Sequence, residues 1–176
     1  YYSNDGEISS NGFDVSLSVT PVKTRDFEWT IGGNFSTFAN EVKSLGKVNE
    51  TITTLGDGAE VITRVGENPY SFYGYKALGV FSTPEEAETT YKGVTNLVNK
   101  NGVAYKAGDV HYEDVNSDGI INNLDKQVIG SATPDFFGSF YNHLQYKGFA
   151  LDLTFVYSVG NDAYNAVRRV TESASD

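Results

Sequence analysis

The stretch FFGSFYNHLQYKGFALDLTFVYS, residues 136–158, decides the fold. In its second half, one set of alternate residues is large and apolar. That set is Phe149, Leu151, Leu153, Phe155 and Tyr157, and the other set is Ala150, Asp152, Thr154, Val156 and Ser158. Alternation over about nine residues is typical of a strand with two different faces, and it is long enough to cross a bilayer at a tilt. The first half, 136–145, is joined to the second by the tight turn Tyr146–Gly148, so the stretch predicts a β-hairpin.

A second alternating hairpin lies near the start of the chain. Its apolar set is Phe13, Val15, Leu17 and Val19, followed by Phe27, Trp29, Ile31, Gly33 and Phe35. The polar stretch Pro21–Asp26 is the predicted turn. In a soluble sandwich the polar face would meet water and the apolar face would fill a core. In a membrane barrel the apolar face would meet lipid and the polar face would line a wet lumen. Alternation alone does not choose between them.

The connections between these strands are very unequal in length. Each hairpin has a short turn, whereas residues 40–133 form a connection of roughly ninety residues, far above the usual loop length. Short turns on one side and long excursions on the other are typical of outer-membrane barrels. We therefore expect a barrel hairpin at 1–39, an extracellular loop lobe at 40–133, and a second barrel hairpin with the start of the next loop at 134–176. Within the lobe, Thr83-Pro84-Glu85-Glu86 predicts the start of a short helix.

Composition narrows the class of protein. The chain of 176 residues is 39% hydrophobic and 14% aromatic and lacks any long helical stripe, so we expect an all-β fold. It contains no cysteine, which excludes a disulfide scaffold and a thiolate metal site. A net charge of −10 argues against nucleic acid as a partner. The chain begins at Tyr1 without Met, and we interpret it as a segment of a longer protein.

An acidic loop at residues 114–125 is the strongest candidate site. Numbered as a calcium-binding loop, its ligands at positions 1, 3, 5, 7 and 12 are Asp114, Asn116, Asp118, the carbonyl of Ile120, and Asp125. Gly119 at position 6 permits the sharp turn, and Ile121 at position 8 would anchor the loop in apolar contacts. The arrangement resembles a dockerin-type loop, which also has Asp at position 12. The spacing predicts a structural Ca²⁺ ion. The alternative is an Asx-rich turn that binds nothing, and the sequence leaves both open.

Catalysis finds no support in the sequence. His111 and His143 lie in different elements, and the chain has neither a cysteine nucleophile nor a Gly-x-Ser-x-Gly motif. We therefore do not expect an enzyme.

The order of short motifs along the chain resembles a known family. The motifs are Asn11–Leu17, Asp26–Trp29, Asn40–Val42, Val65–Pro69, Phe72–Tyr75 and Gly79–Phe81, then Gly108–Val110, Asp114–Gly119, Ile129–Gly130, Pro134, Tyr146–Phe149 and Gly160–Asn165. They resemble the C-terminal β-barrel segment of SusC/RagA-family TonB-dependent outer-membrane transporters. The resemblance covers nearly the whole chain.

This resemblance implies a parent barrel of about 22 antiparallel transmembrane strands in the bacterial outer membrane. It also implies nutrient uptake of glycans, oligosaccharides or peptides together with a SusD-like surface lipoprotein. Energy would come from TonB with ExbB and ExbD, acting through an N-terminal plug outside this stretch. The alternative function is a secreted, calcium-stabilised β-sandwich adhesin or a dockerin-like binding module. That alternative predicts a second acidic loop, which the sequence lacks.

Overall fold

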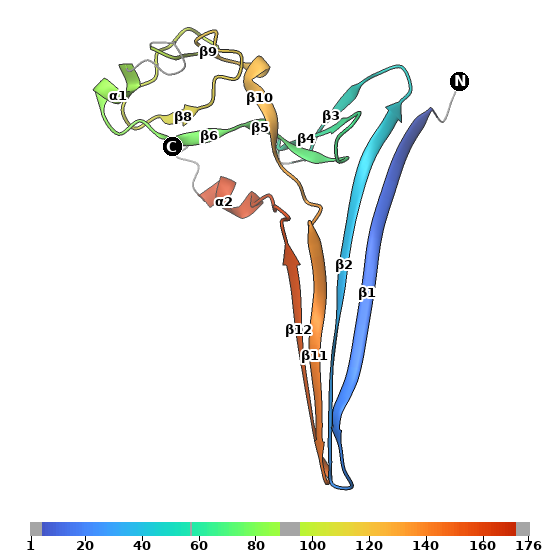
Figure 1. Ribbon diagram of the computed structural model, residues 1–176. Helices are drawn as coiled ribbons and strands as arrows, with labels where there is room; N and C mark the ends of the chain where they lie inside the picture. Colours follow the sequence, from blue (N-terminus) through green and yellow to red (C-terminus); the bar gives the residue numbers. More distant parts are fainter. Residues whose placement is uncertain (1–4, 57, 89–95, 172–176) are drawn as a thin grey trace. The chain divides into compact units, whose positions relative to one another are not determined.

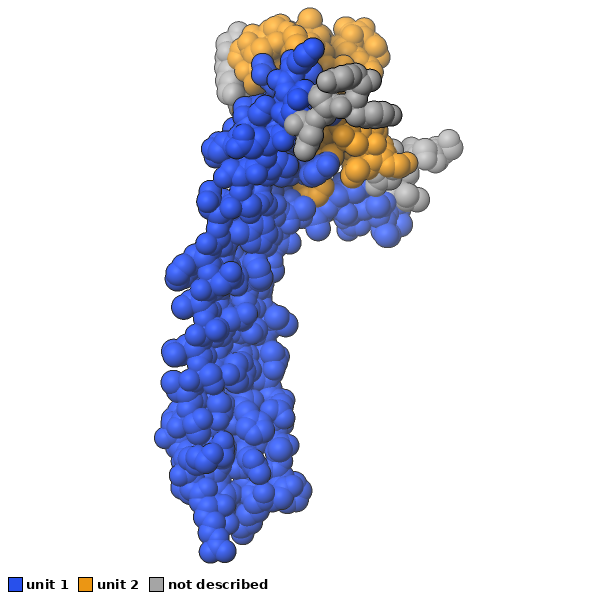
Figure 2. All heavy atoms as spheres, turned by 90° about the vertical axis from the view of Figure 1, so that its right-hand side faces the viewer, with its two compact units in different colours: residues 1–51, 63–70, 131–176 blue, residues 52–62, 71–130 orange. Residues whose placement is uncertain are grey.

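The computed structural model describes residues 5–56, 58–88 and 96–171. The chain divides into two compact units, which Figure 2 shows in different colours. Unit 1 contains residues 1–51, 63–70 and 131–176, and unit 2 contains residues 52–62 and 71–130. Each unit is described by itself below.

Unit 1 is built on a sheet of four long antiparallel strands (Figure 1). The strands are β1 (Gly6–Lys23), β2 (Phe27–Leu45), β11 (Phe136–Tyr146) and β12 (Phe149–Val159), in the spatial order β1-β2-β11-β12. Both predicted hairpins are therefore present. The central pairing of β2 with β11 joins them and runs without a register break from Phe27↔Tyr146 to Ser36↔Phe137. A short helix, α2 (Ala166–Thr171), follows β12.

The first hairpin is longer than the sequence predicts. Pro21 lies within β1, at a register shift between Val19 and Val22, and only residues 24–26 form the turn. The predicted turn Pro21–Asp26 is therefore too long. Proline has no N–H to donate to a strand ladder, but Pro21 lies in a bulge, where no ladder hydrogen bond is required of it. Strand β2 continues to Leu45, beyond residue 39, where we expected the hairpin to end. Its extension is held by the backbone of residues 66–67: Val42 donates to Glu67 O at 3.0 Å and accepts from Gly66 N at 2.8 Å.

Unit 2 consists of short strands and turns. Its largest sheet has the order β10-β5-β4-β3, from β3 (Glu50–Thr54), β4 (Glu60–Arg64), β5 (Ser71–Tyr75) and β10 (Lys126–Gly130). Two smaller pairs accompany it: β6 (Ala77–Val80) with β8 (Val110–Tyr112), and the parallel pair β7 (Val98–Asn99) with β9 (Ile120–Ile121). The helices are α1 (Pro84–Glu88) and the 3₁₀ helix η1 (Asn123–Asp125).

A small hydrophobic core holds unit 2 together. It contains Phe81, Ala87, Leu97 and Ile121, each at most 5% exposed, with Tyr75, Tyr105 and Tyr112 packed against it. Helix α1 starts at Pro84 as predicted, and Thr83 Oγ1 caps it by accepting a hydrogen bond from Glu86 N at 3.2 Å. Among residues 5–56, 58–88 and 96–171, no helix is long and apolar enough to cross a membrane.

Candidate functional site

The sheet of unit 1 has one face that is mainly apolar and one that is mainly polar but also carries Phe137 and Val156. Because β12, β11 and β2 pair without a bulge, residues directly opposite one another share a face. One face carries Phe27, Trp29, Ile31 and Phe35 of β2, Phe140, Leu144 and Tyr146 of β11, and Phe149, Leu151, Leu153, Phe155 and Tyr157 of β12. Phe149 is 80% exposed and Phe155 61% exposed. Apolar side chains exposed over so large an area mark a surface that meets lipid or another protein.

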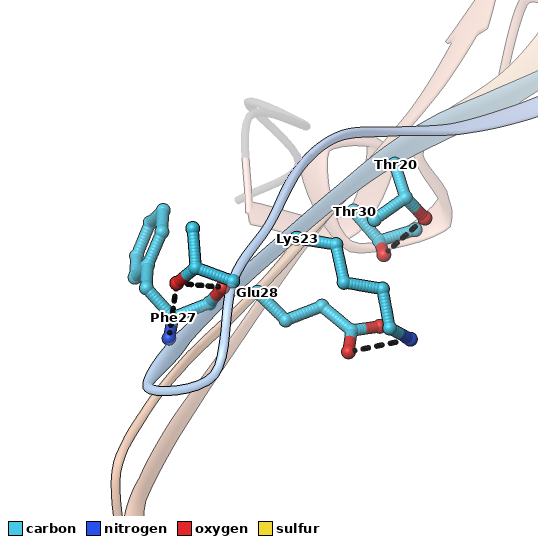
Figure 3. A network of polar contacts seen from close by, with 6 residues as sticks. Thr20, Lys23, Phe27, Glu28 and Thr30 are labelled. Carbon is cyan, nitrogen blue, oxygen red and sulfur yellow. Dashed lines mark hydrogen bonds and ion pairs between the residues drawn. The ribbon is translucent and has the colours of Figure 1, made fainter.

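The opposite face is lined by polar side chains that bond across the strands. The Nδ1 atom of His143 lies 2.6 Å from Asp152 Oδ1, and Asn34 Oδ1 accepts hydrogen bonds from both N and Oγ of Ser139 at 2.6 Å. Figure 3 shows the end of this face near the first turn, where Thr20 Oγ1 lies 2.9 Å from Thr30 Oγ1. Asp152 and Leu153 therefore belong to opposite faces, as the alternation predicts.

Two glycine–tyrosine pairs pack the sheet closely. Gly32 lies directly opposite Tyr141, and a Cβ atom on Gly32 would come within 2.5 Å of the tyrosine Cζ and Oη atoms. Gly138 lies opposite Tyr157 in the same way on the apolar face, and a Cβ there would overlap the carbonyl oxygen of Asn34. The tyrosine rings thus cover strand glycines, which would otherwise leave gaps. These pairs are not evident from the sequence, because the first depends on the register of β2 with β11 and the second on the register of β11 with β12.

One polar pair interrupts the apolar face. The indole Nε1 of Trp29 donates a hydrogen bond to Asn142 Oδ1 at 3.3 Å. Asn142 lies opposite Ile31 on one side and Leu153 on the other. A polar group in apolar surroundings is costly unless it is hydrogen-bonded, and the indole supplies a hydrogen bond to Asn142. Asn142 is a further residue that the sequence did not reveal.

The acidic loop 114–125 closes on its own backbone. Asp114 is 1% exposed and accepts hydrogen bonds from Ser117 N at 2.7 Å and Gly119 N at 2.9 Å. Asp125 is fully buried and accepts from Val115 N at 3.0 Å and Asn122 N at 2.8 Å. The two carboxylates therefore fix the beginning and the end of the loop.

The other predicted ligands lie in the same loop and are also hydrogen-bonded. Asp118 Oδ1 accepts from Ile120 N at 2.8 Å, and Asp118 Oδ2 accepts from the side chain of Asn116 at 2.9 Å. The Ile120 carbonyl accepts from Asn122 Nδ2 at 3.1 Å. Asn122 also caps η1 through a capping box with Asp125, a role that the spacing of the loop did not reveal. Ile121 is 5% exposed and anchors the loop in the core of unit 2, as expected.

The oxygen ligands of the loop suit a hard cation, but its carboxylate oxygens already accept hydrogen bonds from backbone N–H groups. Across the described residues, no group of three or more His, Cys, Asp or Glu side chains is placed to hold a metal ion. A carboxylate oxygen has more than one lone pair, so an accepted N–H bond does not by itself prevent coordination. Calcium binding by Asp114, Asn116, Asp118, Ile120 and Asp125 therefore stays a prediction.

Tyr105 lies beside the loop's anchor in the core. Burial raises the pKa of the Tyr105 hydroxyl, and the charges of Tyr112, Tyr75, Asp109 and Asp125 raise it further. The Tyr105 ring packs against Phe81, with 6.1 Å between the two ring centroids.

Comparison with known proteins identifies relatives of this chain. The chain is 32% identical to TonB-dependent receptor P39 of Formosa agariphila over 98% of this chain and 19% of that receptor. It is 31% identical to TonB-dependent receptor P3 of the same organism over 92% of this chain and 16% of that receptor. It is 22% identical to TonB-dependent receptor SusC of Bacteroides thetaiotaomicron over 92% of this chain and 15% of SusC. The chain is a stretch of a SusC/RagA-type TonB-dependent receptor.

The fold agrees with this assignment. A solved structure described as the RagAB peptide transporter superposes with a TM-score of 0.61 and 24% identity, over 90% of this chain and 16% of that one. No family model matches the chain. The chain spans less than a fifth of the length of the curated relatives it matches. The receptor stretch is thus a piece of the antiparallel β-barrel of an outer-membrane protein, and its two faces are the two faces of the barrel wall.

Proposed function

We propose that the complete receptor imports a nutrient across the outer membrane and that this stretch forms part of its wall. The observation that carries the proposal is the exposed apolar face of the four-stranded sheet, with the polar face opposite. In this arrangement Phe149, Leu153 and Phe155 contact lipid, while Asn34, His143 and Asp152 face the lumen. The lumen wall then offers hydroxyl, amide and charged groups to whatever fills or crosses the barrel.

We further propose that residues 40–133 lie outside the cell and the two short turns lie in the periplasm. The support is the asymmetry of lengths: the turns are residues 24–26 and 147–148, whereas the connection between β2 and β11 carries a core of its own. Barrels of this kind have short periplasmic turns and long extracellular loops.

The proposed partners are inferred from the relatives of this chain. SusC is a relative, and the structure with a similar fold is described as a peptide transporter named RagAB. We therefore propose a SusD-like lipoprotein as the partner at the extracellular side, and TonB with ExbB and ExbD as the energy source. The cargo is an oligosaccharide or a peptide. The Ca²⁺ ion expected in the acidic loop would stiffen unit 2 without touching the cargo.

The alternative of a soluble β-sandwich adhesin or dockerin-like module fits the sheet poorly. A sandwich covers the apolar face of each sheet with the other sheet. Here the apolar face is uncovered within the described residues, and Phe149 and Phe155 are largely exposed.

Labelling of intact cells tests the proposed topology. A membrane-impermeant maleimide should label Lys100→Cys, in an exposed position of unit 2, without permeabilisation. It should label Gly148→Cys, where no atom beyond the two neighbouring residues lies within 4 Å of the new Cβ, only after permeabilisation. The reverse pattern would overturn the orientation. Equal labelling of a secreted, soluble protein at both positions would overturn the importer itself.

A further inference from the structure

The two short turns of the sheet are bonded to each other. The backbone N of Lys147 donates to Asp26 O at 2.7 Å, so residues 24–26 and 147–148 lie side by side. The first turn is closed by Thr24, whose N and Oγ1 both donate hydrogen bonds to Phe27 O, at 2.7 and 3.0 Å. Together the turns form one fixed end of the barrel wall.

A row of aromatic rings borders this end on the apolar face. Phe27, Tyr146 and Phe149 are directly opposite one another on β2, β11 and β12. Tyr146 is 54% exposed and Phe149 is 80% exposed. Aromatic girdles of this kind mark the level where the hydrocarbon of a bilayer meets its headgroups.

Basic side chains stand at the same level. The Nζ atom of Lys147 lies 5.2 Å from the centroid of the Tyr146 ring, so its stem follows the apolar face and its charge stays at the turn. Arg25 is exposed in the neighbouring turn. Lys23 differs, because its Nζ bonds Glu28 Oε2 at 3.0 Å on the polar face (Figure 3). Asp26 adds one exposed carboxylate to these turns. The charges of Lys23 and Glu28 cancel, so Arg25, Asp26 and Lys147 together leave the two turns with a net positive charge.

We propose that Arg25 and Lys147 bind the phosphate of an anionic glycerophospholipid in the leaflet that faces the short turns. This inference rests on the proposed function, because it requires the apolar face to lie in the membrane. The aromatic row would contact the upper part of the acyl chains, and the ammonium over Tyr146 would meet the phosphate. A phosphate in solution would use only the charges and not the adjoining apolar row. A lipid uses both, and it is therefore the ligand that fits this end of the sheet.

Lipid binding to the full-length receptor tests the proposal. The detergent-solubilised receptor would be titrated with phosphatidylglycerol or phosphatidylcholine, and bound lipid counted by native mass spectrometry. Lys147→Gln should weaken phosphatidylglycerol binding about fivefold, as should Arg25→Gln, since each basic group near the surface contributes about 1 kcal/mol. Lys147→Arg should retain binding. The matched control Lys23→Gln removes the same charge from the polar face and should leave binding unchanged.

Three results would overturn the inference. One is equal binding of the two lipids by the wild type, and a second is unchanged phosphatidylglycerol binding by the Arg25→Gln/Lys147→Gln double variant. The third is competition by inorganic phosphate as effective as competition by the lipid. Outer-membrane insertion and topology would be measured by cell labelling on the wild type and on the variants. A wild-type receptor that inserts with the expected topology but lacks the lipid preference refutes only this inference, whereas a wild type that does not insert refutes the proposed function.

Discussion

A lysine at Leu153 should destabilise the folded receptor, whereas a lysine at the adjacent Thr154 should not. Leu153 lies on the apolar face, four residues along β12 from Phe149 at the turn. A rise of about 3.4 Å per residue and a tilt of about 40° place it about 10 Å above the aromatic row. That is close to the middle of an apolar band about 25 Å tall, where a lysine costs about 2–4 kcal/mol.

The adjacent position provides the matched control. Thr154 lies directly opposite Tyr141 on the polar face, at nearly the same depth. A lysine there would extend into the lumen and keep its hydration, so we expect a change well below that at Leu153. The two variants have the same introduced residue, the same strand and the same net charge, and they differ in the side chain replaced and in the face that receives the charge.

Urea unfolding of the refolded receptor in phospholipid vesicles measures both variants. Leu153→Lys should lower the free energy of unfolding by about 2–4 kcal/mol, and a loss of about 3 kcal/mol is more than a hundredfold in the folding equilibrium. Equal losses for Leu153→Lys and Thr154→Lys would show that the sheet has no lipid-facing side. A larger loss at Thr154 would show that the assignment of the two faces is reversed.

Three further changes test the packing and the loop. Gly138→Ala should lower the free energy of unfolding by about 1–3 kcal/mol, because its Cβ would overlap the Asn34 carbonyl. Thermal unfolding measures this loss, and the control Gly148→Ala, whose Cβ points into open space, should show none. Ile121→Ala should cost about 2–5 kcal/mol in unit 2 by removing a buried side chain from its core, and hydrogen exchange there would detect it; unchanged protection would contradict the core. If the acidic loop binds calcium, Asp118→Ala should lower the melting temperature in calcium and not in chelator. Wild type and variant that melt alike in both would show that the loop is only a turn.

Alternation identified the strands because their residues face two different environments. The stretches 13–19, 27–35 and 149–157 follow a period of two, and each lies within a strand of the sheet. The ends were predicted less well. Gly6–Ser10 lacks a regular alternation although it pairs with β2, and Pro21 looked like a turn because the bulge that accommodates it depends on the partner strand. The pairing of β1 with β2 cannot be derived from the local composition of either strand.

The contacts that the sequence did not predict are those between distant segments. Trp29 and Asn142 are 113 residues apart, and their hydrogen bond depends on the register of β2 with β11. The pairing of Gly32 with Tyr141 depends on the same register. In the acidic loop, the spacing predicted a set of five calcium ligands, and that set stays a prediction. The spacing did not predict that Asp125 would hold two segments of backbone, through Val115 N and Asn122 N, or that Asn122 would cap η1.

Depth-dependent fluorescence quenching tests the central claim, that the apolar face of this sheet lies in lipid. This stretch contains no cysteine, so single cysteines at positions 151 to 155 of β12 can carry a fluorophore in an otherwise cysteine-free receptor. In vesicles of brominated phospholipid we expect strong quenching for Leu151→Cys, Leu153→Cys and Phe155→Cys, and weak quenching for Asp152→Cys and Thr154→Cys. Quenching that does not alternate along the strand would contradict the account.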